Sequence, residues 1–174
     1  MSPGEVRVPL QLSMRRPCLR LPVLLSACVL LACASPPPAS PPAAVEVPIQ
    51  VVENMVLVAA SVNGGPSALL VVDTGATSTM LTPRLLARLG IAVPADAPKH
   101  KVRVVGGQTL DVPFVKIARI KIGGATMIDQ EIGVYEIHPD APILEGLLGG
   151  DFLNRYRVTL DRSAKQMRLE PLGR

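Results

Sequence analysis

The stretch Leu70-Val71-Val72-Asp73-Thr74-Gly75-Ala76-Thr77-Ser78 decides the fold, because it places a lone carboxylate directly after an apolar run. Residues Leu69 to Val72 predict a buried strand, and burying an unpaired carboxylate costs several kcal/mol. Two interpretations of Asp73 follow from this position. Either its side chain closes a turn at the end of the strand, or it is kept there for chemistry.

The segments on both sides of this stretch indicate an antiparallel, all-β domain. Short β-branched runs alternate with the turn signals Asn63-Gly64-Gly65, Gly106-Gly107 and Gly123-Gly124, where tight hairpins need residues that accept a positive φ. Strands are predicted for residues 50–61, 67–72, 102–105, 109–122, 125–134, 157–161 and 166–170.

Two short helices are predicted beside these strands. The first covers residues 82–89, with Thr82 as its N-cap, Pro83 at the first helical position and Gly90 after its end. The second covers residues 151–155, and we expect Asp151 to be its N-cap.

An internal repeat relates the two halves of this domain. Each unit contains two strands joined by a glycine turn, then a corner, then a helix, and the corners are residues 73–75 and 147–149. When Gly75 is aligned with Gly149, Leu147 takes the place of Asp73. Only one of the two related corners therefore carries a carboxylate.

Three motifs together resemble the retropepsin-like aspartic proteases, most closely their single-domain bacterial members. They are Asp73 to Thr77 after an apolar strand, the glycine-tipped hairpin at Gly106-Gly107, and Gly146 to Gly149 before a short helix. The resemblance covers residues 51–169 and implies an all-β half-barrel with one or two short helices that dimerises. Gly150 departs from the family pattern, in which many relatives carry a bulkier residue.

The resemblance implies an aspartic endopeptidase, a hydrolase that activates water with an Asp dyad formed across a homodimer. Asp73, Thr74 and Gly75 would form the catalytic motif. Asp73 would share a proton with its twin, Thr74 would reach across the dimer axis, and Gly75 would permit a sharp turn. Either Thr77 or Ser78 would bind the outer carboxylate oxygen.

The substrate of such an enzyme would be an extended polypeptide with apolar side chains. The hairpin of residues 104–109 would be a mobile flap over the bound peptide. The residues expected to bind substrate are Val105, Gly106 and Gly107 in the flap, and Ala76 and Thr77 in the loop after Asp73.

No cofactor and no metal are expected. All three cysteines, Cys18, Cys28 and Cys33, precede the predicted domain, which excludes a thiolate metal site in it. His100 and His138 have no ligand-like spacing, so we expect both to be surface residues in loops.

Residues 1–33 predict a signal peptide of the lipoprotein type, with Met14 as an alternative start. Arginines precede an apolar run of 12 residues, 21–32, which is too short to span a bilayer as a helix. The run Leu30 to Cys33 resembles a lipobox, so Cys33 is the expected lipidation site. Cys28, or cleavage near Ala34 without a lipid, remains the alternative. We expect the protein at the periplasmic side of a bacterial cell envelope, held to the membrane through a lipid anchor.

Residues 34–48 predict a proline-rich linker, and residues 49–172 the protease domain. The chain has 18 basic and 14 acidic residues, of which four Arg and one Glu precede Cys33, leaving 14 and 13. This balance, with no Trp, gives no basic surface for nucleic acid, so no nucleic-acid partner is expected.

Two other functions fit the same sequence. The domain could be a non-catalytic envelope module that keeps the fold for peptide binding or assembly. Alternatively, a different partner chain could supply the second Asp. The intact Asp73-Thr74-Gly75 motif favours the homodimeric enzyme.

Overall fold

The computed structural model describes residues 43–104 and 106–173, which form mostly β-strands with two short helices. The predicted signal peptide, with Cys33, and Val105 lie outside the described residues. No helix in the described ranges is long and apolar enough to cross a membrane. The strands are β1 (Val45–Val52), β2 (Met55–Val62), β3 (Ser67–Val72), β4 (Met80–Leu81), β5 (Lys99–Arg103), β6 (Thr109–Ile122), β7 (Ala125–Val134), β8 (Gly146–Leu148), β9 (Tyr156–Asp161) and β10 (Gln166–Pro171). The helices are α1 (Pro83–Arg88) and α2 (Gly150–Leu153).

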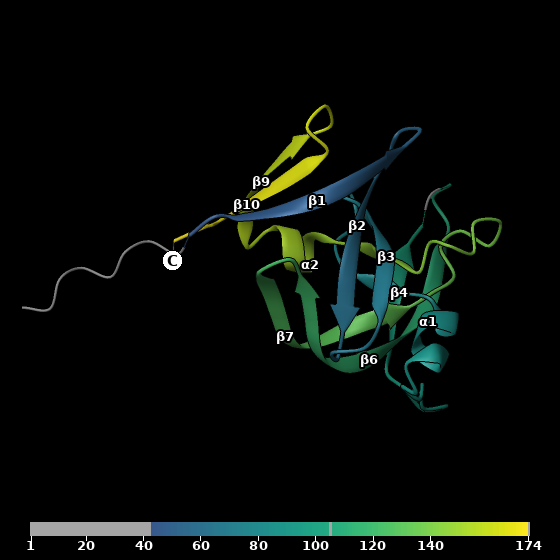
Figure 1. The fold of residues 1–174 in the computed structure, drawn as a ribbon. Coiled ribbons are helices and arrows are strands. Elements are labelled where there is room, and N and C mark those ends of the chain that lie inside the picture. The colour runs from purple at the N-terminus through teal and green to yellow at the C-terminus, as the bar shows by residue number, and fades with distance from the viewer. Residues whose placement is uncertain (1–42, 105, 174) are drawn as a thin grey trace, which may run out of the picture. The chain divides into compact units, whose positions relative to one another are not determined.

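All ten strands belong to one sheet, in the order β5-β6-β7-β4-β8-β3-β2-β1-β10-β9, with an additional pairing of β6 with β2. Figure 1 shows the β9–β10 hairpin beside β1. β3 and β8 are parallel neighbours, with Val72 opposite Leu148. Because parallel strands end at the same edge, the two corners of the predicted repeat meet, and the Asp73 N–H donates to the Leu148 carbonyl at 3.0 Å.

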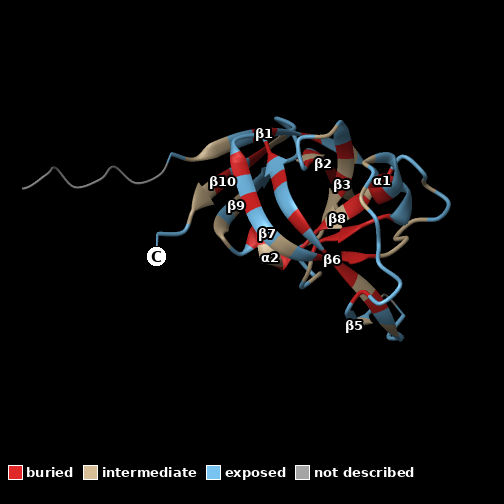
Figure 2. Cartoon of the chain, turned by 90° about the horizontal axis from the view of Figure 1, so that it is seen from below, coloured by how far each residue is buried: buried red, intermediate tan, exposed pale blue. Residues whose placement is uncertain are grey.

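Buried apolar side chains form a large core cluster between these strands, with Leu70, Leu81, Leu148 and Phe152 fully buried. Figure 2 shows buried bands alternating with exposed bands along the strands, as expected for sheets with one buried face. By contrast, β5 at one edge of the sheet is largely exposed (Figure 2). The core therefore fixes the ends of β3 and β8 and includes Val115, Ile117, Ile120 and Ile122 of β6, while β5 contributes no residue to it.

Helix α1 has the caps that the sequence predicts. The Thr82 hydroxyl accepts a hydrogen bond from the Leu85 N–H at 3.2 Å, and Pro83 opens the helix. Gly90 follows its end with φ +69°, a left-handed conformation that glycine adopts without strain. The Ile91 N–H then donates a hydrogen bond to the Leu86 carbonyl at 2.9 Å, which ends the helix.

The single strand predicted over residues 50–61 is wrong, because the chain turns back at Glu53-Asn54. Val52 pairs with Met55 across this turn, so β1 and β2 form a hairpin. Glu53 has a φ of +52°, which is uncommon for a residue other than glycine. The turn contains no glycine or proline, and Asn54 is its only turn-favouring residue, so the turn signal in the sequence is weak.

The folded domain begins earlier than residue 49. Strand β1 starts at Val45, inside the segment assigned to the linker. Its first half, to Pro48, pairs with β10, and its second half, from Ile49, pairs with β2. Val47 and Ile49 are buried, so this segment alternates inward and outward like the strands after it.

Candidate active site

Asp73 lies in a tight turn at the end of β3, with its side chain half-buried. The Gly75 N–H donates to its carboxylate oxygen Oδ1 at 2.9 Å, and the Ala76 N–H donates to its carbonyl at 3.3 Å. This is the turn geometry that the first interpretation of Asp73 requires. Within the described residues, however, no donor reaches the other carboxylate oxygen, Oδ2. One oxygen is therefore held while the other is available to a reactant or a partner.

Glycine at position 75 leaves space beside the Asp73 carboxylate. Gly75 is not among the residues with positive φ. A Cβ atom added there would lie 3.3 Å from Asp73 Oδ1, so the carboxylate would have to shift by a few tenths of an ångström. Glycine therefore avoids crowding of the carboxylate, and it does not supply a left-handed turn.

The loop after Asp73 is fixed by helix α2. The Gly150 N–H donates to the Ala76 carbonyl at 2.8 Å, and the Asp151 N–H donates to the Thr77 carbonyl at 3.0 Å. The Asp151 carboxylate accepts from the Thr79 N–H at 2.8 Å and from the Thr79 hydroxyl at 2.6 Å. The second half of the domain thus sets the shape of the loop that carries Asp73.

The prediction that Asp151 is the N-cap of α2 is wrong. The N-cap is Gly149, which has no side chain to bond the helix, and Asp151 lies in the first turn. Its carboxylate is used instead to hold Thr79, which is fully buried. Sequence alone does not show this contact, because the two residues are 72 positions apart.

Backbone atoms leave no room for a side chain at Gly149, whereas the atom nearest to a Cβ at Gly150 is the end of the movable Asn154 side chain. An added Cβ would lie 2.5 Å from the Ser78 carbonyl carbon at position 149, and 2.8 Å from Asn154 Nδ2 at position 150. The departure of Gly150 from the bulkier residue of the resembled family thus accompanies close packing of α2 on the loop after Asp73.

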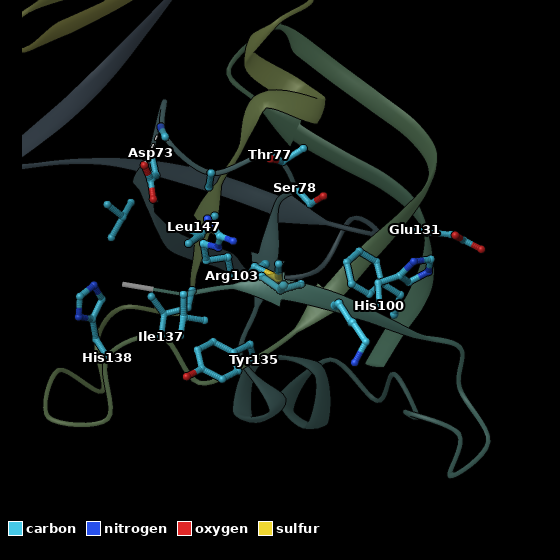
Figure 3. Close-up of a pocket in the computed structure, with 18 residues that line it drawn as sticks. Asp73, Thr77, Ser78, His100, Arg103, Glu131, Tyr135, Ile137, His138 and Leu147 are labelled. Carbon is cyan, nitrogen blue, oxygen red and sulfur yellow. Dashed lines mark hydrogen bonds between the residues drawn. The ribbon is translucent and has the colours of Figure 1, made fainter. Parts of the chain in front are cut away.

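The prediction that Thr77 or Ser78 binds the Asp73 carboxylate is wrong for this structure. Among the described residues, the only donor to that carboxylate is the Gly75 N–H. Both side chains instead line the cleft in front of Asp73 (Figure 3).

A cleft of about 1130 Å³ opens beside Asp73 (Figure 3). One side is the loop of residues 75–78, and another is formed by β5 and Val104. Tyr135, Ile137 and His138 contribute from the segment after β7. With this volume the cleft has room for several amino-acid side chains.

Apolar side chains form the floor of this cleft. Met80, Val112 and Phe114 are a second buried cluster, separate from the main core. Tyr135 and Leu147 pack against it while also lining the cleft. Leu147 therefore lies in the site, as the repeat alignment suggests, but it contributes an apolar surface and not a second carboxylate.

The segment after β7 is held in place by helix α1. Arg88 Nη2 lies 2.7 and 2.8 Å from the two carboxylate oxygens of Glu145. Arg84 also donates to the carbonyl of Pro142. These contacts fix the far end of the segment that carries Ile137 and His138.

The predicted flap is a hairpin between β5 and β6. The Val104 N–H donates to the Gln108 carbonyl at 2.9 Å, and the Gly107 N–H donates to the Val104 carbonyl at 3.1 Å. Gly106 and Gly107 have φ values of +95° and +82°, which explains why glycine occupies the tip. Val105, also assigned to substrate binding, is not described.

Both histidines line the cleft, and His100 is exposed there, in agreement with its predicted surface position. His100 lies in strand β5, not in a loop, and its ring meets that of Phe114 edge-on with centroids 4.5 Å apart. His138 is half-buried on the opposite side (Figure 3). The sequence does not predict a strand at His100, because residues 99–101 are all polar and show no alternation of apolar and polar side chains.

Sequence reasoning also missed Arg103 and Tyr135 as cleft residues. Arg103 ends β5 and is exposed, and Tyr135 directly follows β7. Arg103 reaches the cleft of Asp73 because β5 pairs with β6, and Tyr135 reaches it because β7 pairs with β4. The hydrophobic pattern of the sequence does not show which strands pair.

Comparison with known proteins identifies a family and a fold. A family model described as aspartyl protease matches residues 58–152, more than half of the chain. The structure is similar to the crystal structure of a retropepsin-like aspartic protease from Rickettsia conorii, with a TM-score of 0.55 and 18% sequence identity. That match covers 73% of this chain and 89% of the other. No curated protein matches the sequence. The predicted retropepsin-like, all-β fold is thus confirmed.

Proposed function

Because this chain belongs to the aspartyl protease family, we propose that it is an aspartic endopeptidase that works as a homodimer on exposed polypeptide segments. The observation that carries the proposal is the position and hydrogen bonding of the Asp73 carboxylate. Its carboxylate lines the cleft, with one oxygen held by the Gly75 N–H and the other without a donor among the described residues.

The reaction needs two carboxylates that share one proton. Proximity disfavours ionisation of both, so one remains protonated and the pair titrates as a unit. The ionised carboxylate takes a proton from water as the water oxygen attacks the peptide carbonyl carbon. The protonated carboxylate supplies the proton that lets the amide nitrogen depart as an amine.

A second chain is the proposed source of the second carboxylate. Asp151 cannot serve, because both of its oxygens bind Thr79. Glu131 lines the cleft but is exposed on β7, opposite Lys116. Asp73 is therefore the suitable group in the described chain, and a two-fold axis would bring its twin beside it.

The neighbouring residues have proposed roles in the same dimer. Thr74 is exposed at the turn, where its hydroxyl can reach the partner loop. Ala76 and Thr77 line the cleft and would contact the substrate backbone. The flap that covers the peptide and excludes water would be formed by Val105, Gly106 and Gly107.

We further propose that the protein is anchored in the bacterial envelope through lipid on Cys33, with the proline-rich segment as a tether. More than one acyl chain is needed for stable attachment, and lipoprotein modification would supply several. In cells, Cys33→Ala should move the protein from the membrane fraction to the soluble fraction, while Cys28→Ala should leave it in place. The reverse result would assign the lipid to Cys28, and no shift with either would exclude a lipid anchor.

The proposed activity is tested with purified full-length protein and an unstructured polypeptide at mildly acidic pH. Cleavage is expected for the wild type, and Asp73→Asn should lower kcat/KM by about 10³-fold, since general acid–base groups contribute 10²–10⁴-fold. Asp96→Asn, at an exposed carboxylate outside the cleft, is the matched control and should keep wild-type activity. Sedimentation should show dimers for all three proteins.

Other outcomes separate the alternative functions. No cleavage by the wild type at any pH would favour a non-catalytic, peptide-binding module. A monomer that becomes active only when another protein is added would indicate a different partner chain.

A further inference from the structure

We propose that Arg103 forms a subsite for a substrate carboxylate, so that the enzyme prefers polypeptides with Asp or Glu close to the scissile bond. This inference rests on the proposed proteolytic function. It adds a charge preference to the apolar preference that the cleft floor implies.

Arg103 stands at the right place for such contact. It is the last residue of β5, directly before Val104 and the flap tip. It lines the same cleft as Asp73 and Leu147. Figure 3 draws its side chain among those that line the cleft, together with Asp73, Leu147 and Tyr135. A peptide in this cleft would therefore pass beside the guanidinium group.

The Arg103 guanidinium has no partner within residues 43–104 and 106–173. Its strand neighbour Lys101, by contrast, is paired with Asp111 at 3.3 Å. Arg88 and Arg168 likewise bind carboxylates of the chain, at 2.7 and 3.4 Å. Arg103 is thus a cleft cation whose hydrogen-bond donors remain available to a ligand.

The acidic side chains of the cleft do not neutralise this charge. The cleft is lined by two carboxylates, Asp73 and Glu131. Asp73 already accepts the Gly75 N–H and is required for the reaction, and Glu131 is opposite Lys116 in the β6–β7 pair. No ion pair joins either of them to Arg103 in the described part of the chain.

A carboxylate is the ligand that best matches this group. The planar guanidinium offers two parallel N–H donors that fit a carboxylate, and a charged pair of this kind is stronger than a neutral hydrogen bond. Met80, Phe114 and Leu147 line the same cleft, so a bound peptide would cover the charged pair beside apolar side chains and strengthen the attraction further. Because side chains alternate along an extended peptide, an acidic residue can face Arg103 while its neighbours occupy the apolar floor.

The test begins by mapping where purified full-length protein cleaves an unstructured polypeptide, using mass spectrometry. Asp and Glu should be enriched near the cleaved bonds. A synthetic peptide that spans one such site is then compared with the same peptide carrying Gln in place of Glu. The wild type should cleave the Glu peptide with about tenfold higher kcat/KM, the factor that corresponds to ~1.4 kcal/mol.

Variants assign this preference to Arg103. Arg103→Gln should bring the ratio of the two kcat/KM values to about one, and Arg103→Lys should retain part of it. Arg119→Gln removes an exposed arginine of β6 that does not line the cleft, and it should keep the wild-type ratio. Thermal unfolding confirms that each variant is folded.

Equal cleavage of the two peptides by the wild type, or an unchanged preference in folded Arg103→Gln, would overturn this inference while leaving the protease function intact. Failure of the wild type to cleave either peptide or the polypeptide would instead overturn the proposed function, and the inference with it.

Discussion

Thr79 and Asp151 are joined by two hydrogen bonds across 72 positions of sequence, from the Thr79 N–H at 2.8 Å and from its hydroxyl at 2.6 Å. The Thr79 hydroxyl in turn accepts from the Gly149 N–H at 3.1 Å. Thr79 is fully buried, so water cannot replace these bonds. The loop after Asp73 therefore depends on helix α2 for its shape.

Asp151→Ala should destabilise the protein, because it leaves the buried N–H and hydroxyl of Thr79 without an acceptor. The expected loss is about 3 kcal/mol, since each buried unsatisfied donor costs roughly 1–3 kcal/mol. Urea unfolding measures the change in the free energy of unfolding. All proteins are compared at the same concentration, because the stability of a dimer depends on protein concentration.

Asp151→Asn is the graded control for this contact. Its amide oxygen can still accept from the Thr79 N–H, so the loss should be about 1 kcal/mol. Asp96→Ala, at an exposed carboxylate, should change stability by no more than about 0.5 kcal/mol. A loss for Asp151→Ala as small as that for Asp96→Ala would contradict the role given to this hydrogen-bond network.

Gly149→Ala should also destabilise the site, for a steric reason. The added Cβ would lie 2.5 Å from the Ser78 backbone, which must shift to make room. Overpacking of this kind costs about 1–3 kcal/mol, and displacement of the Asp73 loop should lower kcat/KM as well.

Gly173→Ala is the matched control, because nothing lies within 4 Å of a Cβ built at that position. It should retain wild-type stability and activity. If Gly149→Ala matched Gly173→Ala in both measurements, the close packing of α2 against residue 78 would not matter for the site.

The β9–β10 turn should make stability depend on pH. The backbone N–H of Ala164 and the side chain of Ser163 bind the Asp161 carboxylate, and they hold the pKa of Asp161 below its ordinary value of 3.8. A lowered pKa means that the ionised form is favoured in the folded protein. The stabilisation is therefore present above pH 3.8 and is lost as the pH falls below that value.

Asp161→Ala tests this dependence through the difference in melting temperature from the wild type. The wild type should be the more stable protein at pH 6, and the difference should shrink at pH 3, where the carboxyl is increasingly protonated. A difference that stays constant or grows on acidification would show that Asp161 acts by another route.

Most of the fold can be predicted from sequence where a local signal exists. The hairpin turns with glycine, the capped helix α1 and the Asp73 corner all have such signals, and the structure contains them. The Glu53-Asn54 turn has only a weak signal in Asn54, so residues 50–61, the end of β1 and most of β2, are predicted as one strand. Strand β4 contains only Met80 and Leu81, too few residues for a periodic pattern.

The site is predictable only in part, for a related reason. The Asp73 turn is local, and a short stretch of sequence contains all of it. The partner of Asp151 and the cleft position of Arg103 depend on contacts between distant segments. A carboxylate before Phe152 looks like a helix cap in sequence, and only the packing of α2 shows that it holds Thr79.

The most direct measurement of the central claim is the activity of mixed chains, because the proposed site is shared between two copies. Wild-type and Asp73→Asn chains are unfolded together, refolded at constant total concentration, and assayed as the wild-type fraction is varied. If both chains must supply Asp73, activity follows the square of the wild-type fraction, and an equal mixture keeps about a quarter of the full activity. Activity proportional to the wild-type fraction, with about half remaining in the equal mixture, would show that each chain has a complete site of its own and would contradict the account.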